Sequence, residues 1–311
     1  PMQYPFADGH CDFLSGVCAR NYDIAHPAPG QQIALPYLQE GNVRLQFFAM
    51  WPFPHAPKSA REQCLEMFSD YEAMLAAHPV FSPLTPDFDP AGKGIATVLT
   101  IEGGEAIEQD LGLLHDFHQK GVRALTLTWN YPNAIAHPGT EPDSPGLTAF
   151  GREVVREMNA LGMAIDVSHL NDAGVDDLLR LSTQPIFASH SNARALCPHS
   201  RCLSDAHIRA IADMGGVVGV NFFDEHLVQE GRASSRDILA HLRHVIEVGG
   251  VRAACIGTDF DGMQNTPTDL PNSSGMQRIA EGLSKMGLSP AEIRRVTYEN
   301  LRDYILQFGQ K

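Results

Sequence analysis

Histidine and acidic residues stand at the ends of several short apolar runs in this chain, where they could bind metal ions. In the segment Asp8-Gly-His-Cys-Asp12, His10 and Asp12 are two residues apart. On an extended strand both side chains would point to one face, while Cys11 would point to the other. Such a pair could hold one cation, and imidazole and carboxylate groups are ligands that suit zinc.

Later runs supply three further candidates of the same kind. Glu102 follows the apolar run 98–101, and His169 and His190 each end an apolar run of their own. Two pairs of ligands with one carboxylate between them in sequence are enough for two divalent ions bridged by that carboxylate. Two ions about 3.5 to 4 Å apart would make a bridging hydroxide available at neutral pH and would polarise a carbonyl group. The set therefore predicts metal-assisted hydrolysis.

The strands that must position these side chains are expected at eight short runs, residues 6–12, 43–49, 96–101, 124–128, 164–168, 186–189, 217–221 and 254–257. Helical patterns cover residues 61–77, 105–119, 148–161, 173–181, 204–214, 235–248, 274–286 and 290–308. The last pattern has Ser289 as its N-cap and Pro290 at its first position.

Eight alternations of strand and helix, without a GxGxxG or Walker loop, predict an α/β fold of the (β/α)8 TIM-barrel type. We expect one metallo-dependent hydrolase domain over residues 1–311. Side chains at the C-terminal ends of barrel strands face one mouth, so the candidate ligands would converge there. Pro-rich loops, among them 51–55 and 79–90, are expected to rim that mouth.

The composition excludes several classes of partner. A formal net charge of -14 argues against nucleic acid and anionic membranes, which are bound through clustered lysine and arginine. No apolar run reaches the roughly 20 residues of a membrane span, and the segment 1–6 has no signal-peptide pattern. The six cysteines form no C-x-x-C pair, which is typical of reduced thiols. We therefore expect a cytoplasmic protein that acts on a small molecule.

Six motifs together carry a resemblance that covers most of the chain: Asp8-Gly-His-Cys-Asp12, Ile101-Glu-Gly-Gly104, Leu125-Thr-Leu-Thr128, Asp166-Val-Ser-His-Leu170, Ser189-His-Ser-Asn192 and Gly257-Thr-Asp-Phe-Asp-Gly262. In this order and spacing they resemble the membrane (renal) dipeptidase family, and the chain looks like a soluble, bacterial-type member. The resemblance implies an amidohydrolase-type barrel that cleaves dipeptides with two zinc ions and often accepts a D-residue at the C-terminal position. A homodimer is compatible with the family.

The resemblance also implies a role for each metal ligand. By position, His10 and Asp12 would hold one zinc ion, and His169 and His190 would hold the other. Glu102 would bridge the two ions.

Two charged side chains have rivals nearby in the sequence, and the resemblance selects between them. Asp259 and Asp261 would share one face of a continuing strand, and the family pattern assigns the catalytic proton and the substrate amine to Asp259. A carboxylate beside the bridging water can act first as general base and then as general acid. Arg201, rather than Arg194, resembles the arginine that meets the substrate carboxylate, a planar group that arginine can bind bidentately.

The chain departs from the family pattern after Leu125-Thr-Leu-Thr128, where many members have a histidine that is thought to polarise the substrate carbonyl. Here Trp129 and Asn130 follow. Trp129 could stack on a substrate side chain or narrow the pocket, and Asn130 could donate a hydrogen bond to the oxyanion. A second departure is Cys202, where an asparagine is common.

Three hypotheses for the function remain open. The first is a zinc-dependent dipeptidase with a small dipeptide as substrate. The second is another amidohydrolase, such as a deacylase acting on an N-acyl amino acid or a small cyclic amide. The third is a non-catalytic metal-binding scaffold barrel, since Trp129 could mark lost activity. The intact ligand set and Asp259 argue against a scaffold, because charged groups that converge in a cavity are costly to bury.

Overall fold

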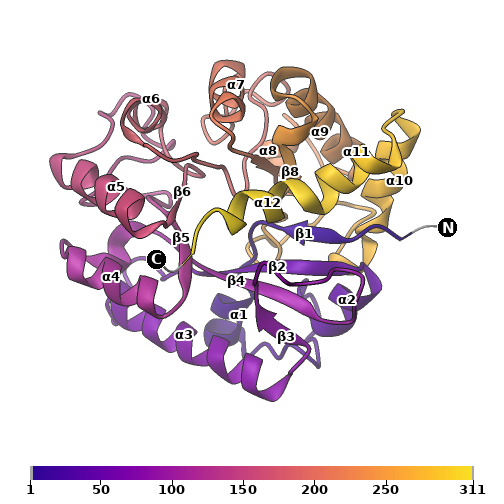
Figure 1. Cartoon of the computed structure of the whole chain (residues 1–311), viewed down its shortest axis with the longest axis horizontal. Helices are drawn as coiled ribbons and strands as arrows, with labels where there is room; N and C mark the ends of the chain where they lie inside the picture. Colours follow the sequence, from indigo (N-terminus) through magenta and orange to yellow (C-terminus); the bar gives the residue numbers. More distant parts are fainter. Residues whose placement is uncertain (1–2, 310–311) are drawn as a thin grey trace.

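A computed structural model describes residues 3–309 of the chain. Parallel strands form its centre, and helices surround them (Figure 1). One continuous ladder runs in the order β1 (Phe6–Asp8), β2 (Val43–Met50), β4 (Ile95–Glu102), β5 (Val122–Thr126) and β6 (Ala164–Asp166). A second ladder joins β7 (Val218–Val220) to β8 (Ala254–Ile256), and the short β3 (Phe81–Pro83) pairs with the start of β4.

Isolated bridges close the two ladders into a barrel. Phe187 pairs with Asp166 at the end of β6, and Ala188 pairs with Val218 of β7. On the other side of the ring, Cys11 pairs with Phe260, just beyond β1 and β8. Residues 187–188 thus take the place of the predicted strand 186–189. The predicted TIM-type barrel is confirmed.

The helices have the following bounds: α1 (Phe13–Arg20), α2 (Leu35–Glu40), α3 (Ala60–Ala77), α4 (Leu111–Gln119), α5 (Ala149–Leu161), α6 (Asp172–Leu181), α7 (Asp205–Asp213), α8 (Asp224–Leu227), α9 (Ser235–Gly249), α10 (Gln277–Lys285), α11 (Pro290–Arg294) and α12 (Asn300–Leu306). The predicted N-cap Ser289 is confirmed, and Glu292 completes a capping box with it. Within residues 3–309, no helix combines the length and apolar character needed to cross a bilayer.

The barrel interior is packed with apolar side chains up to one end. Inward residues of the strands, such as Ala7, Phe47 and Phe187, form one cluster with α12. The Tyr304 ring lies 4.8 Å from the Phe187 ring, and its hydroxyl donates a hydrogen bond to the Pro185 carbonyl, which precedes that strand position. Helix α12 crosses the centre of the ring in Figure 1 and closes the N-terminal end of the barrel. A ligand must therefore enter from the opposite, C-terminal end.

Several predicted boundaries were wrong, and side-chain hydrogen bonds explain the first of them. The strand predicted over residues 6–12 ends at Asp8, whose carboxylate accepts the backbone N–H of His10 and of Thr258. These side-chain bonds replace the strand ladder. Asp12 begins α1 with φ -111° and ψ 30°, so His10 and Asp12 do not lie on one extended strand. They still meet, because the chain turns between β1 and α1.

Two predicted helices are interrupted, and four elements were not predicted. Pattern 105–119 divides into the 3-10 turn Gly104–Ile107 and α4, because Glu108 adopts φ 52° and Asp110 caps a new helix. Pattern 290–308 contains a π-helical segment, Arg295–Glu299, between α11 and α12. Helices α1, α2 and α8 and strand β3 were missed. The predicted domain of 1–311 includes residues 1–2 and 310–311, which lie outside the described part.

Candidate active site

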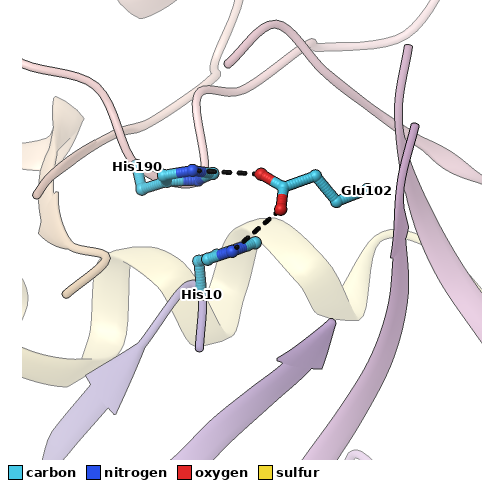
Figure 2. A group of neighbouring side chains, drawn as sticks. All are labelled: His10, Glu102 and His190. Atoms are coloured by element: carbon cyan, nitrogen blue, oxygen red, sulfur yellow. Dashed lines mark ion pairs between the residues drawn. The ribbon is translucent and has the colours of Figure 1, made fainter. Parts of the chain in front are cut away.

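The five predicted metal ligands converge at the C-terminal mouth of the barrel. The Nε2 atom of His10 lies 3.3 Å from Asp12 Oδ2 and 3.5 Å from Glu102 Oε1. The other oxygen of the glutamate, Oε2, lies 3.1 Å from His169 Nε2 and 3.3 Å from His190 Nε2. Figure 2 shows the Glu102 carboxylate beside the stacked rings of His10 and His190, with one oxygen directed toward each ring. Its two oxygens therefore face different groups of ligands.

These distances fit a metal centre. Two ligand atoms bound tetrahedrally to one zinc ion at 2.0 to 2.1 Å would be about 3.3 to 3.4 Å apart. Asp12 Oδ1, Glu102 Oε2 and His190 Nε2 are buried and have no hydrogen-bond partner among the described residues. Buried polar atoms without a partner are costly, and a bound cation would remove that cost. Among the described residues, two groups have the spacing to hold an ion: His10, Glu102 and His190, and His10, Asp12 and Asp259; His169 belongs to neither group and contacts the cluster through Glu102. The donor set fits divalent metal.

Hydrogen bonds beneath the site fix which nitrogen of His190 is free. The Asp166 carboxylate accepts the backbone N–H of Ser168 at 3.0 Å and of Ser189 at 2.8 Å, and it also accepts the Thr126 and Ser189 hydroxyls. Since the Ser189 proton is donated to Asp166, its oxygen must accept from His190 Nδ1, 2.7 Å away. The Nε2 atom of His190 then keeps its lone pair for a metal, because a hydrogen bond at one ring nitrogen fixes the tautomer of the other.

The ring of His169 is oriented by Asn130. Its Nδ1 atom lies 2.8 Å from Asn130 Oδ1, and a carbonyl oxygen can only accept, so Nδ1 carries the proton and Nε2 is free. His169 also adopts φ 70°, a left-handed conformation that is uncommon for non-glycine residues and recurs at active sites. The sequence suggested Asn130 as an oxyanion donor, and this contact with His169 is one that it did not reveal.

Burial and neighbouring charges shift the pKa values of the three histidines in different directions. Burial, aided by the Arg201 cation, lowers the pKa of His169 to about 4. Burial and the charge of His10 lower the pKa of His190 well below its usual value. Burial also acts to lower the pKa of His10, but the charges of Glu102 and Asp12 outweigh it and leave that pKa well above the usual value. His169 and His190 are thus held neutral, the form that binds metal.

The carboxylates are shifted as well. Burial would raise the pKa of Glu102, but the charge of His10 acts against it, and that pKa lies well below its usual value. Burial and the charge of Asp12 raise the pKa of Asp259 well above its usual value. Negative charge is therefore concentrated around His10, where a cation would be stabilised.

The structure gives the two competing aspartates different surroundings. Asp259 adopts φ 65° and places Oδ1 3.5 Å from His10 Nε2. Asp261 accepts the backbone N–H groups of Gln32 at 2.7 Å and Ile33 at 3.3 Å. Asp259 therefore faces the ligand cluster, whereas both oxygens of Asp261 secure a neighbouring loop.

The two competing arginines also differ. Arg194 binds the Asp172 carboxylate through two hydrogen bonds of 2.8 Å. Arg201 is 7% exposed and donates to the Ser191 hydroxyl and the His190 carbonyl, while its Nε has no partner within residues 3–309. The Nε atom of Arg194 also lacks a partner among the described residues. The two arginines differ because Arg194 is paired with a carboxylate, whereas Arg201 has no such partner within residues 3–309 and its charge is available to a ligand.

A cavity of about 290 Å³ opens above the cluster. Of the predicted site residues, Asp12, Glu102, Trp129, His169 and Asp259 line it. His10 and His190 lie beneath, each 1% exposed, and Arg201 and Asn130 are not part of the lining.

Sequence analysis did not single out three other lining residues, Arg20, Trp51 and Phe53. The signal for two of them was the Pro-rich segment 51–55, which was expected to rim the site. The other such segment, 79–90, was placed wrongly: it contains β3, which pairs with the start of β4 at the opposite end.

A parallel β/α barrel with imidazole and carboxylate groups gathered at its C-terminal mouth is the architecture of a metal-dependent hydrolase. More specifically, the chain belongs to the membrane dipeptidase family, peptidase family M19, whose family model matches residues 2–303. It is therefore a member of a family of peptide-bond hydrolases.

Relatives and solved structures agree with this membership. Dipeptidase 3 of Mus musculus is 30% identical over 326 aligned positions, which cover 99% of this chain and 65% of that protein. The chain thus spans about two thirds of the length of this relative. A protein in the pqqA 5′ region of Klebsiella pneumoniae is 36% identical over 218 positions, covering 67% of this chain and 80% of its own length.

Two crystal structures match with a TM-score of 0.90. One is a metallopeptidase from Rhodobacter sphaeroides, liganded with a phosphinate mimic of the dipeptide L-Ala-D-Ala, with 28% identity over 99% of this chain and 100% of that one. The other is a dipeptidase described as a metallopeptidase of family M19, with 29% identity over 99% of both chains. Both structures share the barrel fold of this chain.

Proposed function

We propose that this chain is a zinc-dependent dipeptidase in which the five ligands hold two cations with Glu102 between them. One observation carries the proposal. The Glu102 oxygens are divided, with Oε1 3.5 Å from His10 and Oε2 within 3.3 Å of both His169 and His190. A carboxylate shared in this way is suited to bridge a pair of ions rather than to complete a single site.

When bound, the two cations supply Lewis acidity, which lowers the pKa of a water molecule and polarises the scissile carbonyl. Asp259 is the group that transfers the proton of the attacking water. It lines the cavity beside His10 and Asp12, so its carboxylate can accept a proton from the attacking water and deliver it to the leaving amine. Asn130 and Ser189 hold His169 and His190 in the tautomers that this arrangement requires.

Arg201 gives the site its preference for a free C-terminus. Its buried Nε–H has no partner among the described residues, and a guanidinium group matches the planar geometry of a carboxylate. The mimic bound to the Rhodobacter sphaeroides relative has a D-residue at its C-terminal position, which supports acceptance of D-residues here.

The decisive experiment measures amino-acid release from L,L and L,D dipeptides and from their N-acetylated forms. The zinc-loaded protein is compared with a chelated control, and its metal content is determined in parallel. We expect two zinc ions per chain and chelator-sensitive cleavage of free dipeptides. Cleavage of the blocked forms alone would identify a deacylase, and no turnover with zinc bound would revive the scaffold hypothesis.

An Arg201→Lys variant tests the assignment of the substrate carboxylate. Lysine keeps the charge but loses the planar donor pair, so KM for free dipeptides should rise about tenfold or more while zinc content stays the same. Arg194→Lys is the matched control, because Arg194 is already paired with Asp172, and its KM should not change.

Cytoplasmic location and homodimer formation stay predictions from the sequence. Cell fractionation and sedimentation of the purified protein would test them separately.

A further inference from the structure

Three aromatic residues, Trp51, Phe53 and Trp129, form one side of the cavity, which we call the aromatic wall. The Trp51 ring lies 4.7 Å from the Phe53 ring and 4.8 Å from the Trp129 ring, and the two tryptophans meet edge to face. Trp129 in turn lies 6.3 Å from the ring of His169. The wall therefore runs without a break from the ligand cluster to the mouth.

The rest of the cavity lining includes several charged side chains. Asp12, Asp259 and Asp261 line it, together with Arg20. A ligand in this cavity thus meets charged groups on one side and aromatic rings on the other. Phe53 at the mouth is 38% exposed, so a ligand that covers it would remove apolar surface from water.

The order of the strands places the wall away from Arg201. Trp51 follows β2 and Trp129 follows β5, the two neighbours of β4, which ends at Glu102. Arg201 donates a hydrogen bond to the carbonyl of His190, which follows the bridging residues 187–188. In the order of the barrel, residues 187–188 come third after β4, beyond β5 and β6. A dipeptide with its carboxylate at Arg201 and its scissile carbonyl above Glu102 would extend its other residue toward the wall.

We infer that the aromatic wall selects substrates by the side chain of the N-terminal residue and favours large apolar or aromatic side chains there. This inference rests on the proposed dipeptidase function. Aromatic rings offer flat apolar surface and favourable edge-to-face contacts with another ring. The cavity of about 290 Å³ is at the small end of the range for ligand pockets, which suits a dipeptide with one large side chain.

The test compares kcat/KM for two series of L,L dipeptides, X-Ala and Ala-X, in which X is Ala, Leu, Phe or Lys. The zinc-loaded wild-type protein should prefer Leu-Ala and Phe-Ala to Ala-Ala by about 10- to 200-fold, the usual range for contacts in an apolar pocket. The Ala-X series should show no comparable gain. In Trp51→Ala, the ratio of Phe-Ala to Ala-Ala should fall about tenfold or more.

Two controls accompany this experiment. Leu196→Ala truncates another side chain that is 38% exposed and does not line the cavity, and its Phe-Ala to Ala-Ala ratio should match the wild type. Trp51→Phe keeps an aromatic ring. If the missing ring causes the loss in Trp51→Ala, Trp51→Phe should retain most of the preference for Phe-Ala over Ala-Ala. Zinc content and thermal unfolding report whether either variant is misfolded.

Five outcomes would overturn the inference. Equal loss on every peptide in Trp51→Ala would mean that the rings only support the loops. A gain confined to the Ala-X series would assign the wall to the C-terminal residue. Preference for Lys-Ala over Phe-Ala would mean that the rings and the cavity carboxylates bind a cation. A flat X-Ala series with Ala-Ala turnover intact refutes this inference alone, whereas no turnover of any dipeptide refutes the proposed function as well.

Discussion

The floor of the cavity and its aromatic wall are held in place by different means. On the floor, His10, Glu102 and His190 are at most 3% exposed, and hydrogen bonds from the barrel interior fix the orientation of His190. The wall residues lie on loops after β2 and β5, where their rings contact one another and Ser15 and Gln63 hydrogen-bond to the backbone of Trp51 and Phe53. A rigid polar floor suits chemistry that every substrate shares, whereas rings on loops can change substrate choice without disturbing that chemistry.

The largest effect on activity should come from removing a metal ligand from the floor of the cavity. Glu102→Gln removes the charge that faces both groups of ligands, so we expect kcat/KM to fall by roughly 10³-fold for all dipeptides, or about 4 kcal/mol at 1.36 kcal/mol per tenfold. Zinc content should also fall below two ions per chain. Glu105→Gln is the matched control, because Glu105 contacts Asn133 and does not line the cavity. Full activity in Glu102→Gln would contradict the bridging role.

A smaller effect should follow from removing a hydrogen bond that orients a metal ligand while the ligand itself is kept. In Ser189→Ala, His190 Nδ1 loses its acceptor, and the ring is no longer held in the metal-binding tautomer. Zinc affinity, measured by competition with a chromogenic chelator, should fall about 10- to 100-fold. Ser289→Ala is a serine control that removes an N-cap of α11 and should lower stability by about 1 kcal/mol with no change in zinc affinity. Unchanged affinity in Ser189→Ala would show that His190 needs no orienting bond.

At the wall, Trp129→His should alter substrate choice rather than the floor. We expect zinc content to stay the same, while the Phe-Ala to Ala-Ala ratio of kcat/KM falls about tenfold, because Trp129 is the wall residue next to His169. If the histidine instead raised turnover of every dipeptide alike, this position would act on catalysis. No change in either quantity would leave Trp129 without a role.

The smallest effect is expected away from both regions, at the pair Asp172 and Arg194. Hydrogen bonds from Arg194 lower the pKa of Asp172 below its usual value, so the stabilisation is present above the unfolded-state pKa and is lost as pH falls through the folded-state pKa. Because the Asp172 side chain is 47% exposed, Asp172→Asn should lower the free energy of unfolding by no more than about 1 kcal/mol at pH 7.

The difference in the free energy of unfolding between the wild type and Asp172→Asn should shrink at about pH 3. Urea unfolding at the two pH values measures it, with Arg194→Ala and the double variant as controls in a mutant cycle. Zinc affinity and substrate ratios should be unaffected. A difference that grows as pH falls would contradict the assigned sign.

Periodicity and motifs in the sequence were enough to predict the barrel, most helices and the grouping of the five ligands. Apolar runs mark buried strands, and parallel strands in a closed barrel bring their C-terminal ends to one mouth. The positions at which strands end were harder to predict. The run 186–189 forms only single bridges, because the His190 N–H is donated to the Ser168 hydroxyl rather than to a neighbouring strand.

The sequence by itself determined which residue types stand at the strand ends, and hence a metal-dependent hydrolase. The family resemblance already selected Asp259 over Asp261, but only the tertiary structure supplied a physical reason: the Asp261 carboxylate accepts the backbone N–H of Gln32, 229 positions away. The tertiary structure also brought Trp51 against Trp129 and joined Asp166 to His190 through Ser189. Sequence patterns report which side chains are buried, but the partners they meet depend on how distant segments pack, and in this cavity those partners decide tautomers, charges and substrate contacts.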